Sequence, residues 1–161
     1  MDELIVTRQM EYDCIVSLCS LIPREINASN TLVVMVSPDY SATAAMHVAH
    51  HLSFDGEMCD IITVDVPYPD EEVTPFIIAA SKKFANITHP NVLLVEAGII
   101  RGGNYTWLTE LLEEISKSRV ITSTLYENIH SKFKSDYVAR YYDDRVEDLT
   151  FYYEQYNKHW S

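Results

Sequence analysis

The residues with the clearest potential for chemistry lie between positions 92 and 104, where a hydrophobic run passes through one acid into a glycine-rich turn. The apolar run at 92–95 predicts a strand that is buried on both faces of a parallel sheet. Glu96 follows this run, and we expect a helix to begin near Tyr105. Because loop N–H groups and a helix N-terminus point outward at the carboxyl edge of such a sheet, the segment predicts a site for an anionic ligand.

The candidate ligand-binding residues of this segment combine one acid, one cation and a tight turn; they are Glu96, Arg101, Gly102, Gly103, Asn104 and Tyr105. Two consecutive glycines let the backbone turn sharply and expose its N–H groups. Arg101 adds a positive charge, and the helix dipole favours an anion at the first turn. A simpler interpretation stays open, in which the glycines form an ordinary strand-to-helix turn and Glu96 accepts hydrogen bonds from neighbouring N–H groups.

The elements that must position these residues follow from the hydrophobic patterns. Helices are predicted at 10–22, 42–53, 75–84 and 105–118, and strands at 31–36, 60–66, 92–95, 119–125 and 137–142. Ser41 and Thr74 are the predicted N-caps of the second and third helices. The alternation of strands and helices predicts an α/β fold, a single domain over residues 1–161 with a parallel sheet flanked by helices. The aromatic segment 147–160 is not assigned to helix or coil.

The charge balance, the apolar runs and the cysteines bear on the expected binding partners and on the cellular compartment. The chain has 24 acidic and 12 basic residues, which give a net charge of −12 and oppose binding to nucleic acid or to an acidic membrane. No apolar run is long enough to span a membrane, and the acidic start, Met1-Asp2-Glu3, does not resemble a signal peptide. Three cysteines in apolar surroundings are typical of reduced thiols in a cytoplasmic protein.

Several segments, in the same order along the chain, resemble the type I phosphoribosyltransferases, most closely the bacterial xanthine/hypoxanthine-guanine enzymes. The matching segments are 4–7, 31–37, 92–104, 135–139 and 151–154. The resemblance implies a type I phosphoribosyltransferase-like fold, and in an active member it implies Mg²⁺ and transfer of a phosphoribosyl group from phosphoribosyl diphosphate to a 6-oxopurine. It also implies that Ser37, Asp39 and Tyr40 occupy the position of the loop that holds pyrophosphate.

The loop that corresponds to the pyrophosphate loop departs from the family pattern. In the family, an Arg-Gly-Gly segment after a serine usually offers backbone N–H groups to pyrophosphate, whereas here Pro38-Asp39-Tyr40 follows Ser37. Proline has no N–H group. Asp39 places a negative charge where the leaving group would lie, and two unit charges about 4 Å apart repel by about 4 kcal/mol at a surface-like dielectric.

The acid pair that grips the ribose in the family is incomplete as well. Glu96 stands at the first acid position, Ala97 at the second, and Ile100 replaces the acid that opens the phosphate loop. With one carboxylate left on this strand, we expect no dedicated metal site. The lysine that recognises a 6-oxopurine in the family is replaced by Tyr126 or Glu127. Phe151, Tyr152 and Tyr153 are candidates for stacking on a base, or for ordinary packing.

Two further clusters have simpler interpretations beside their functional ones. On one predicted helix, His47 shares a face with His50 and with His51 at a spacing that suits metal ligands. No further ligand clusters with these pairs, so we expect exposed or interface histidines and no metal. Six tyrosines crowd the last quarter of the chain, namely Tyr137, Tyr141, Tyr142, Tyr152, Tyr153 and Tyr156. They favour either a subunit or partner contact or the packing of the closing strands.

The sequence therefore favours a phosphoribosyltransferase-like pseudoenzyme that binds a phosphorylated small molecule or a protein partner. It predicts no catalytic residue and no cofactor, and it predicts a homo-oligomer or a protein complex. Two alternatives stay open: an active purine phosphoribosyltransferase that uses Mg²⁺, with Glu96 and Arg101 sharing the substrate-binding role, and an acidic structural or interaction protein without a ligand site.

Overall fold

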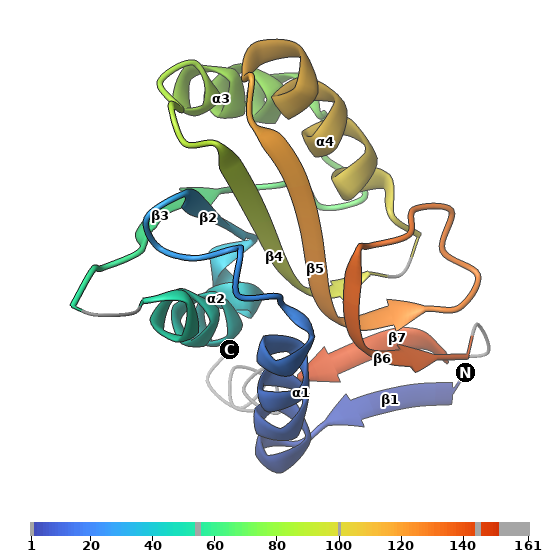
Figure 1. The fold of residues 1–161 in the computed structure, drawn as a ribbon. Coiled ribbons are helices and arrows are strands. Elements are labelled where there is room, and N and C mark those ends of the chain that lie inside the picture. The colour runs from blue at the N-terminus through green and yellow to red at the C-terminus, as the bar shows by residue number, and fades with distance from the viewer. Residues whose placement is uncertain (1, 54–55, 100, 144–145, 152–161) are drawn as a thin grey trace.

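The computed structural model describes residues 2–53, 56–99, 101–143 and 146–151. Its elements in chain order are β1 (Asp2–Val6), α1 (Arg8–Leu21), β2 (Thr31–Val36), α2 (Pro38–Leu52), β3 (Asp60–Val64), α3 (Thr74–Phe84), β4 (Asn91–Ile99), α4 (Gly103–Ile115), β5 (Arg119–Asn128), β6 (Tyr137–Tyr142) and β7 (Val146–Phe151). Figure 1 shows these elements along the chain, from blue at the N-terminus to red at β7.

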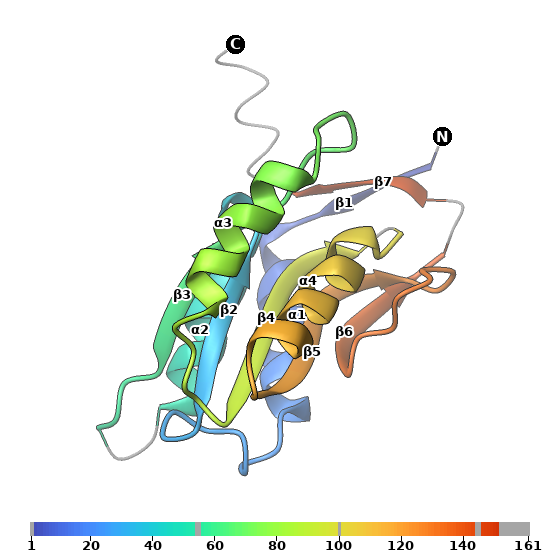
Figure 2. The same cartoon turned by 90° about the horizontal axis from the view of Figure 1, so that it is seen from above.

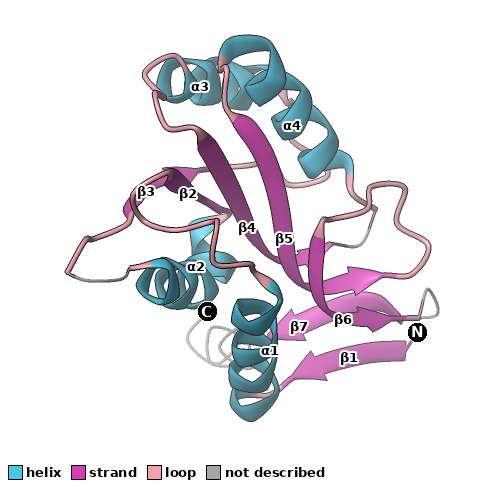
Figure 3. Ribbon diagram, in the orientation of Figure 1, coloured by secondary structure: helices cyan, strands magenta, loops and turns pink. Residues whose placement is uncertain are grey.

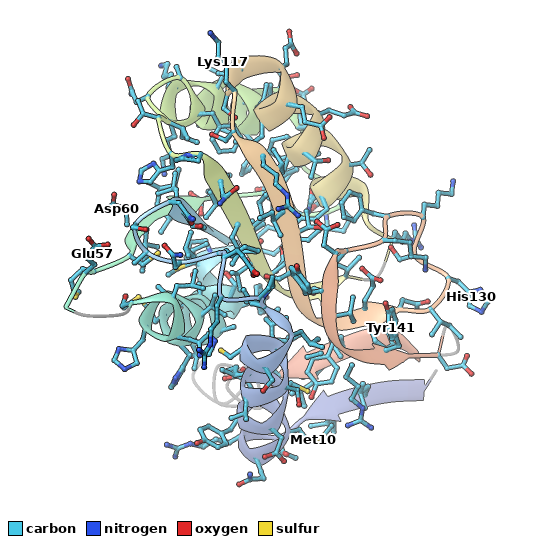
Figure 4. The ribbon with its side chains drawn as sticks, in the orientation of Figure 1. Met10, Glu57, Asp60, Lys117, His130 and Tyr141 are labelled. Carbon is cyan, nitrogen blue, oxygen red and sulfur yellow. The ribbon has the colours of Figure 1, made fainter. Side chains whose placement is uncertain are left out.

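The sheet has five strands in the order β3-β2-β4-β5-β6, and every neighbouring pair is parallel. Asp60 on β3 and Tyr141 on β6 lie toward opposite sides of the molecule, as the strand order requires (Figure 4). The strand β1 pairs with β7 in a separate, parallel two-stranded sheet. The prediction of an α/β fold with a parallel sheet is confirmed.

Helices cover both faces of the five-stranded sheet, with α1 and α2 on one face and α3 and α4 on the other (Figures 2 and 3). The central strand β4 shows why its sequence is continuously apolar. Leu93 and Val95 pack in the cluster with α1 and α2, whereas Val92 and Leu94 pack in the cluster with α3 and α4, and all four are fully buried. The layers therefore follow from the apolar runs that the sequence shows.

The helix starts differ from the predictions, and the N-caps explain why. The predicted cap Ser41 lies inside α2, where its hydroxyl donates to the carbonyl groups of Val36 and Ser37. The helix begins at Pro38 because proline has the backbone angle of a first turn and needs no N–H partner there. Ser37 is therefore the N-cap of α2, in a left-handed conformation with φ 51°.

The other three helices also differ from the predictions, either in the cap or in the first residue. Thr74 lies within α3, whose N-cap is Val73. The helix α1 starts at Arg8, because the Thr7 side chain accepts the Met10 N–H at 3.2 Å. The helix α4 begins at Gly103, two residues before the predicted start, and ends at Ile115.

Strands β4 and β5 extend well beyond their predicted ends at 95 and 125, because the ladder between them continues to the pair Ile99 and Glu127. Glu96 therefore lies within a strand. Gly98 also belongs to β4, and a Cβ atom at this glycine would lie 2.4 Å from the Leu149 side chain. Part of the unassigned segment thus forms β7, which packs over the end of β4. Residues 152–160 of that segment lie outside the described residues.

Candidate functional site

A cavity of about 850 Å³ opens at the carboxyl edge of the sheet. Its walls come from the β2–α2 turn, the end of β3 and the loop after it, the end of β4, the first turn of α4, and β7. The lining residues are Ser37, Pro38, Asp39, Tyr40, Asp65, Val66, Pro67, Tyr68, Pro69, Glu71, Phe76, Glu96, Gly98, Asn104, Leu149 and Phe151. A cavity of this size at this edge is where parallel α/β sheets bind their ligands.

The chemistry of the lining is acidic and aromatic. Four carboxyl groups line the cavity, those of Asp39, Asp65, Glu71 and Glu96, and no Lys, Arg or His side chain is among the described lining residues. Four aromatic side chains add apolar walls; they are Tyr40, Tyr68, Phe76 and Phe151. The cavity therefore has the electrostatic character that favours a cation over an anion.

The backbone of the β2–α2 turn has almost no donor left for a ligand. The Ser37 N–H donates to the Val64 carbonyl at 3.0 Å, and the N–H groups of Tyr40 and Ser41 donate to the Ser37 carbonyl at 2.9 and 3.0 Å. Pro38 has no N–H. Within residues 37–41, only the Asp39 N–H is without a backbone acceptor among the described residues. This turn is therefore poorly suited to bind pyrophosphate, because most of its N–H groups are already hydrogen-bonded and because Asp39 is negatively charged.

Glu96 lies at the buried end of the cavity, with 8% of its surface exposed. Its Oε1 accepts the Ala97 N–H at 2.9 Å. Burial raises the pKa of this carboxyl to about 8, and the N–H groups of Ala97 and Gly98 act in the opposite direction. Glu96 therefore both lines the cavity and accepts a hydrogen bond from its own backbone, so the two interpretations drawn from the sequence coexist.

The second acid position of the resemblance faces away from the site. Ala97 is fully buried and belongs to the apolar cluster under α1 and α2. An aspartate there would place a charge in the hydrophobic core. Ile100, the other replaced acid, lies outside the residues that the structure describes. The local packing around Ala97 thus suits an apolar residue and no ligand contact.

The turn before α4 keeps some features of an anion site. Gly102 has φ 84° and a Cβ atom there would lie 2.4 Å from the Phe133 Cβ, so this turn packs against residues 131–133. Gly103 is exposed, and a Cβ atom at this position would meet no other atom within 4 Å; Arg101 is exposed beside it. Asn104 lines the cavity and its Oδ1 accepts from the Trp107 Nε1 at 3.1 Å.

Tyr105 is a core residue, so its predicted role as a ligand contact does not extend to its side chain. It is 1% exposed, its hydroxyl donates to the Ser123 carbonyl at 2.6 Å, and burial raises its pKa well above the ordinary value. Its ring meets Phe133 edge-on at 5.3 Å between centroids. Its backbone N–H lies in the first turn of α4, where the N–H groups of a helix have no partner within the helix.

The structure thus divides the predicted site residues into two groups. Ser37, Asp39, Tyr40, Glu96 and Asn104 line the cavity, whereas Arg101, Gly102, Gly103 and Tyr105 are not among its described lining residues. Sequence reasoning missed Asp65, Tyr68, Glu71, Phe76 and Leu149, which also line it. The acidic, proline-flanked loop after β3 was the available signal for the first three.

The positions considered for base recognition are only partly at the cavity. Phe151 lines it, whereas Tyr152 and Tyr153 lie outside the described residues. Glu127 is fully buried and its Oε1 accepts the Ser135 N–H at 2.9 Å. Tyr126 is also fully buried and meets Phe151 edge-on at 6.3 Å. Neither Glu127 nor Tyr126 is a described lining residue, so neither side chain lies in the cavity where it could contact a base.

Within the described part of the chain, no group of three or more His, Cys, Asp or Glu side chains is placed to hold a metal ion. The four carboxyl groups of the cavity come from four separate segments of the chain. None of the helices in the described residues is both long and apolar enough to cross a membrane.

The chain has the fold of the type I phosphoribosyltransferases. It is similar to the purine phosphoribosyltransferase from Pyrococcus horikoshii Ot3, with a TM-score of 0.68 and 15% identity over 94% of this chain and 93% of that chain. It is also similar to the Helicobacter pylori xanthine-guanine-hypoxanthine phosphoribosyltransferase, with a TM-score of 0.64 and 12% identity over 99% and 97% of the two chains.

A Bacillus anthracis hypoxanthine-guanine phosphoribosyltransferase gives a TM-score of 0.59 and 19% identity over 88% of this chain and 82% of that one. No family model matches the sequence, and no curated protein is similar to it at the sequence level. At these identities the likeness shows the fold alone, so activity must be argued from the site.

Proposed function

We propose that this protein uses the phosphoribosyltransferase fold to bind a ligand and has no transferase activity. The observation that carries the proposal is the cavity at the carboxyl edge, which has four carboxyl groups and no basic side chain among its described lining residues. Phosphoribosyl transfer needs positive charge and N–H donors around a departing pyrophosphate. Here Asp39 and Asp65 present negative charge instead, and the donors of the β2–α2 turn are occupied.

The binding partner that we propose is either a phosphorylated small molecule or another protein. The turn from Arg101 to Tyr105 supports the first, because it joins an exposed arginine, an exposed glycine and the start of a helix of 13 residues. The tyrosine-rich last quarter of the chain, where Tyr141 on β6 is exposed, supports the second. We also propose a homo-oligomer and a cytoplasmic location; the three free cysteines support the location.

Turnover is the direct test of the proposal. Purified protein with phosphoribosyl diphosphate, Mg²⁺ and hypoxanthine, guanine or xanthine is expected to form no nucleotide above a protein-free control. An active purine phosphoribosyltransferase is the alternative function, favoured by the fold and by Glu96 at the cavity. Nucleotide formation at enzyme-like rates establishes that alternative and overturns the proposal.

A thermal-shift series identifies the ligand class. Ribose 5-phosphate and nucleoside monophosphates are tested with and without Mg²⁺, because a ligand that binds the native state alone raises the melting temperature. We expect a shift that Arg101→Ala abolishes and that Arg119→Ala retains. Arg119 is a matched control because it is an exposed arginine at the opposite, amino end of β5. If no phosphorylated compound gives a shift, the protein-partner form of the proposal is the one to test, by pull-down.

A further inference from the structure

We propose that the cavity at the carboxyl edge binds a linear aliphatic polyamine, a flexible cation with several amino groups separated by methylene chains. The inference rests on the proposed function, because the polyamine would occupy the cavity in which an active transferase would bind phosphoribosyl diphosphate. It goes beyond that proposal by assigning the chemical class of the cavity ligand; Arg101, the cation of the proposed phosphate turn, is not among the described lining residues.

The carboxyl groups are distributed around the cavity and have no cationic neighbour among the described lining residues. Asp39 comes from the first turn of α2, Asp65 follows β3, Glu71 lies in the next loop and Glu96 lies on β4. Between described residues the structure shows a single ion pair, His89 with Asp60 at 2.8 Å, at the amino end of β3. Asp39, Asp65 and Glu71 therefore lack an internal counter-charge within the described residues, whereas Glu96, whose pKa burial raises to about 8, is mainly protonated at neutral pH and contributes hydrogen-bonding oxygens rather than charge.

The cavity acids come from separate segments of the chain and not from one compact cluster. They belong to no group of side chains in the described residues that is placed to hold a metal. A cation that satisfies separate carboxylates must carry its positive charges on separate atoms. A linear polyamine has this property, because each amino group is an independent charge and a hydrogen-bond donor.

The walls between the acids suit methylene chains and ammonium groups. Tyr40 and Phe151 stand with their ring centroids 6.3 Å apart, and Tyr68 and Phe76 line the cavity with them. Aromatic faces attract ammonium groups and pack against methylene chains. The cavity volume of about 850 Å³ lies within the range of about 300–1,000 Å³ that is usual for small-molecule sites.

Calorimetric titration with spermidine at fixed ionic strength tests the proposal. We expect saturable binding of one spermidine, at least tenfold tighter than propylamine or Mg²⁺. The double variant Asp39→Asn/Asp65→Asn is expected to weaken it at least tenfold. The charge-matched control is Asp70→Asn/Glu72→Gln, which removes two exposed acids of the loop after β3 that are not among the described lining residues, and it is expected to bind as the parent does.

A second pair of variants tests the aromatic wall separately from charge. Tyr68→Ala is expected to weaken spermidine binding about threefold to tenfold, whereas Tyr12→Ala, an equally exposed tyrosine on α1, is expected to leave it unchanged. Thermal denaturation of all variants shows that they fold.

Three outcomes overturn the polyamine proposal. Equal weakening by the two acid double variants assigns the binding to the general negative charge of the surface. Binding of Mg²⁺ as tight as that of spermidine assigns the cavity to a metal. An absence of saturable spermidine binding removes the proposal outright, and a basic peptide that then binds points to a protein partner. The nucleotide-formation assay is independent of all three, so it alone decides whether the proposed function fails.

Discussion

Two strand-to-helix turns at the same edge of the sheet offer opposite surroundings to a ligand. Ser37 leads from β2 into α2 and Gly102 leads from β4 into α4; both have left-handed backbone angles and neither makes a side-chain cap hydrogen bond. The first turn of α2 contains Asp39, whereas the first turn of α4 contains no acid and follows Arg101. The fold therefore supplies two similar helix starts, and a few side chains decide which of them tolerates an anion.

Glu96 lies on the strand between these two turns, and its protonation gives the largest expected effect. Its folded-state pKa of about 8 lies above the ordinary value of 4.5, so the folded protein binds more protons than the unfolded chain between these values. Stability should therefore fall as pH rises from about 5 to 8, by about 4 kcal/mol in total. Urea denaturation across this range should show the fall, and Glu96→Gln should flatten it. A pH profile that Glu96→Gln leaves unchanged contradicts the assignment.

The left-handed backbone conformation of Gly102 gives the next largest expected effect on stability. Gly102→Ala forces a side chain into a left-handed backbone and against Phe133, at an expected cost of about 3 kcal/mol in the free energy of unfolding. Gly103→Ala is the matched control, because its Cβ meets open space and alanine favours the helix. Chemical denaturation should show a large loss for the first variant and none for the second. Equal losses would mean that the neighbouring packing at Phe133 is not the cause.

The buried hydroxyl of Tyr105 is expected to serve stability and not ligand binding. Tyr105→Phe removes the donor to the Ser123 carbonyl and should cost about 1–2 kcal/mol in unfolding free energy. The thermal shift given by ribose 5-phosphate should persist in this variant. Its loss without a change in stability would assign the hydroxyl to the ligand.

The electrostatic contrast between the two helix starts gives the smallest effect. Asp39→Asn removes a favourable interaction with the α2 dipole and should destabilise by about 0.5 kcal/mol. Asn104→Asp adds the same interaction to α4 and should stabilise by a similar amount. Urea denaturation at low ionic strength measures both, and the two differences should shrink together in high salt. Changes of the same sign in the two variants would contradict the comparison.

The bounds of β2 and β6 agree with the sequence predictions at 31–36 and 137–142. The first strand is visible in the sequence as a continuous apolar run, and the second as a tyrosine-rich run between polar residues. The N-cap of α2 does not follow from residue type alone. Ser37 and Ser41 both suit a cap by type, and only the position of Pro38 in the first turn distinguishes them.

The candidate site was predictable where the sequence shows a motif or a family resemblance. Glu96 and Asn104 followed from the strand and the turn, and Ser37, Asp39, Tyr40 and Phe151 followed from the resemblance, but Leu149 enters the cavity through the pairing of β7 with β1. No local pattern indicates a pairing between the two ends of a chain. Gly98 is part of the same arrangement, since its missing side chain leaves room for Leu149.

The β1–β7 pair also has a consequence for the order of events during synthesis. Strand β1 leaves the ribosome before every other described strand and β7 leaves after all of them, yet Val6 lies opposite Phe151 in the finished pair. A nascent chain therefore has no partner for β1 until translation has passed residue 151, and closing so long a loop is slow. Because β7 supplies part of the cavity wall, only a chain translated past that point forms the complete cavity.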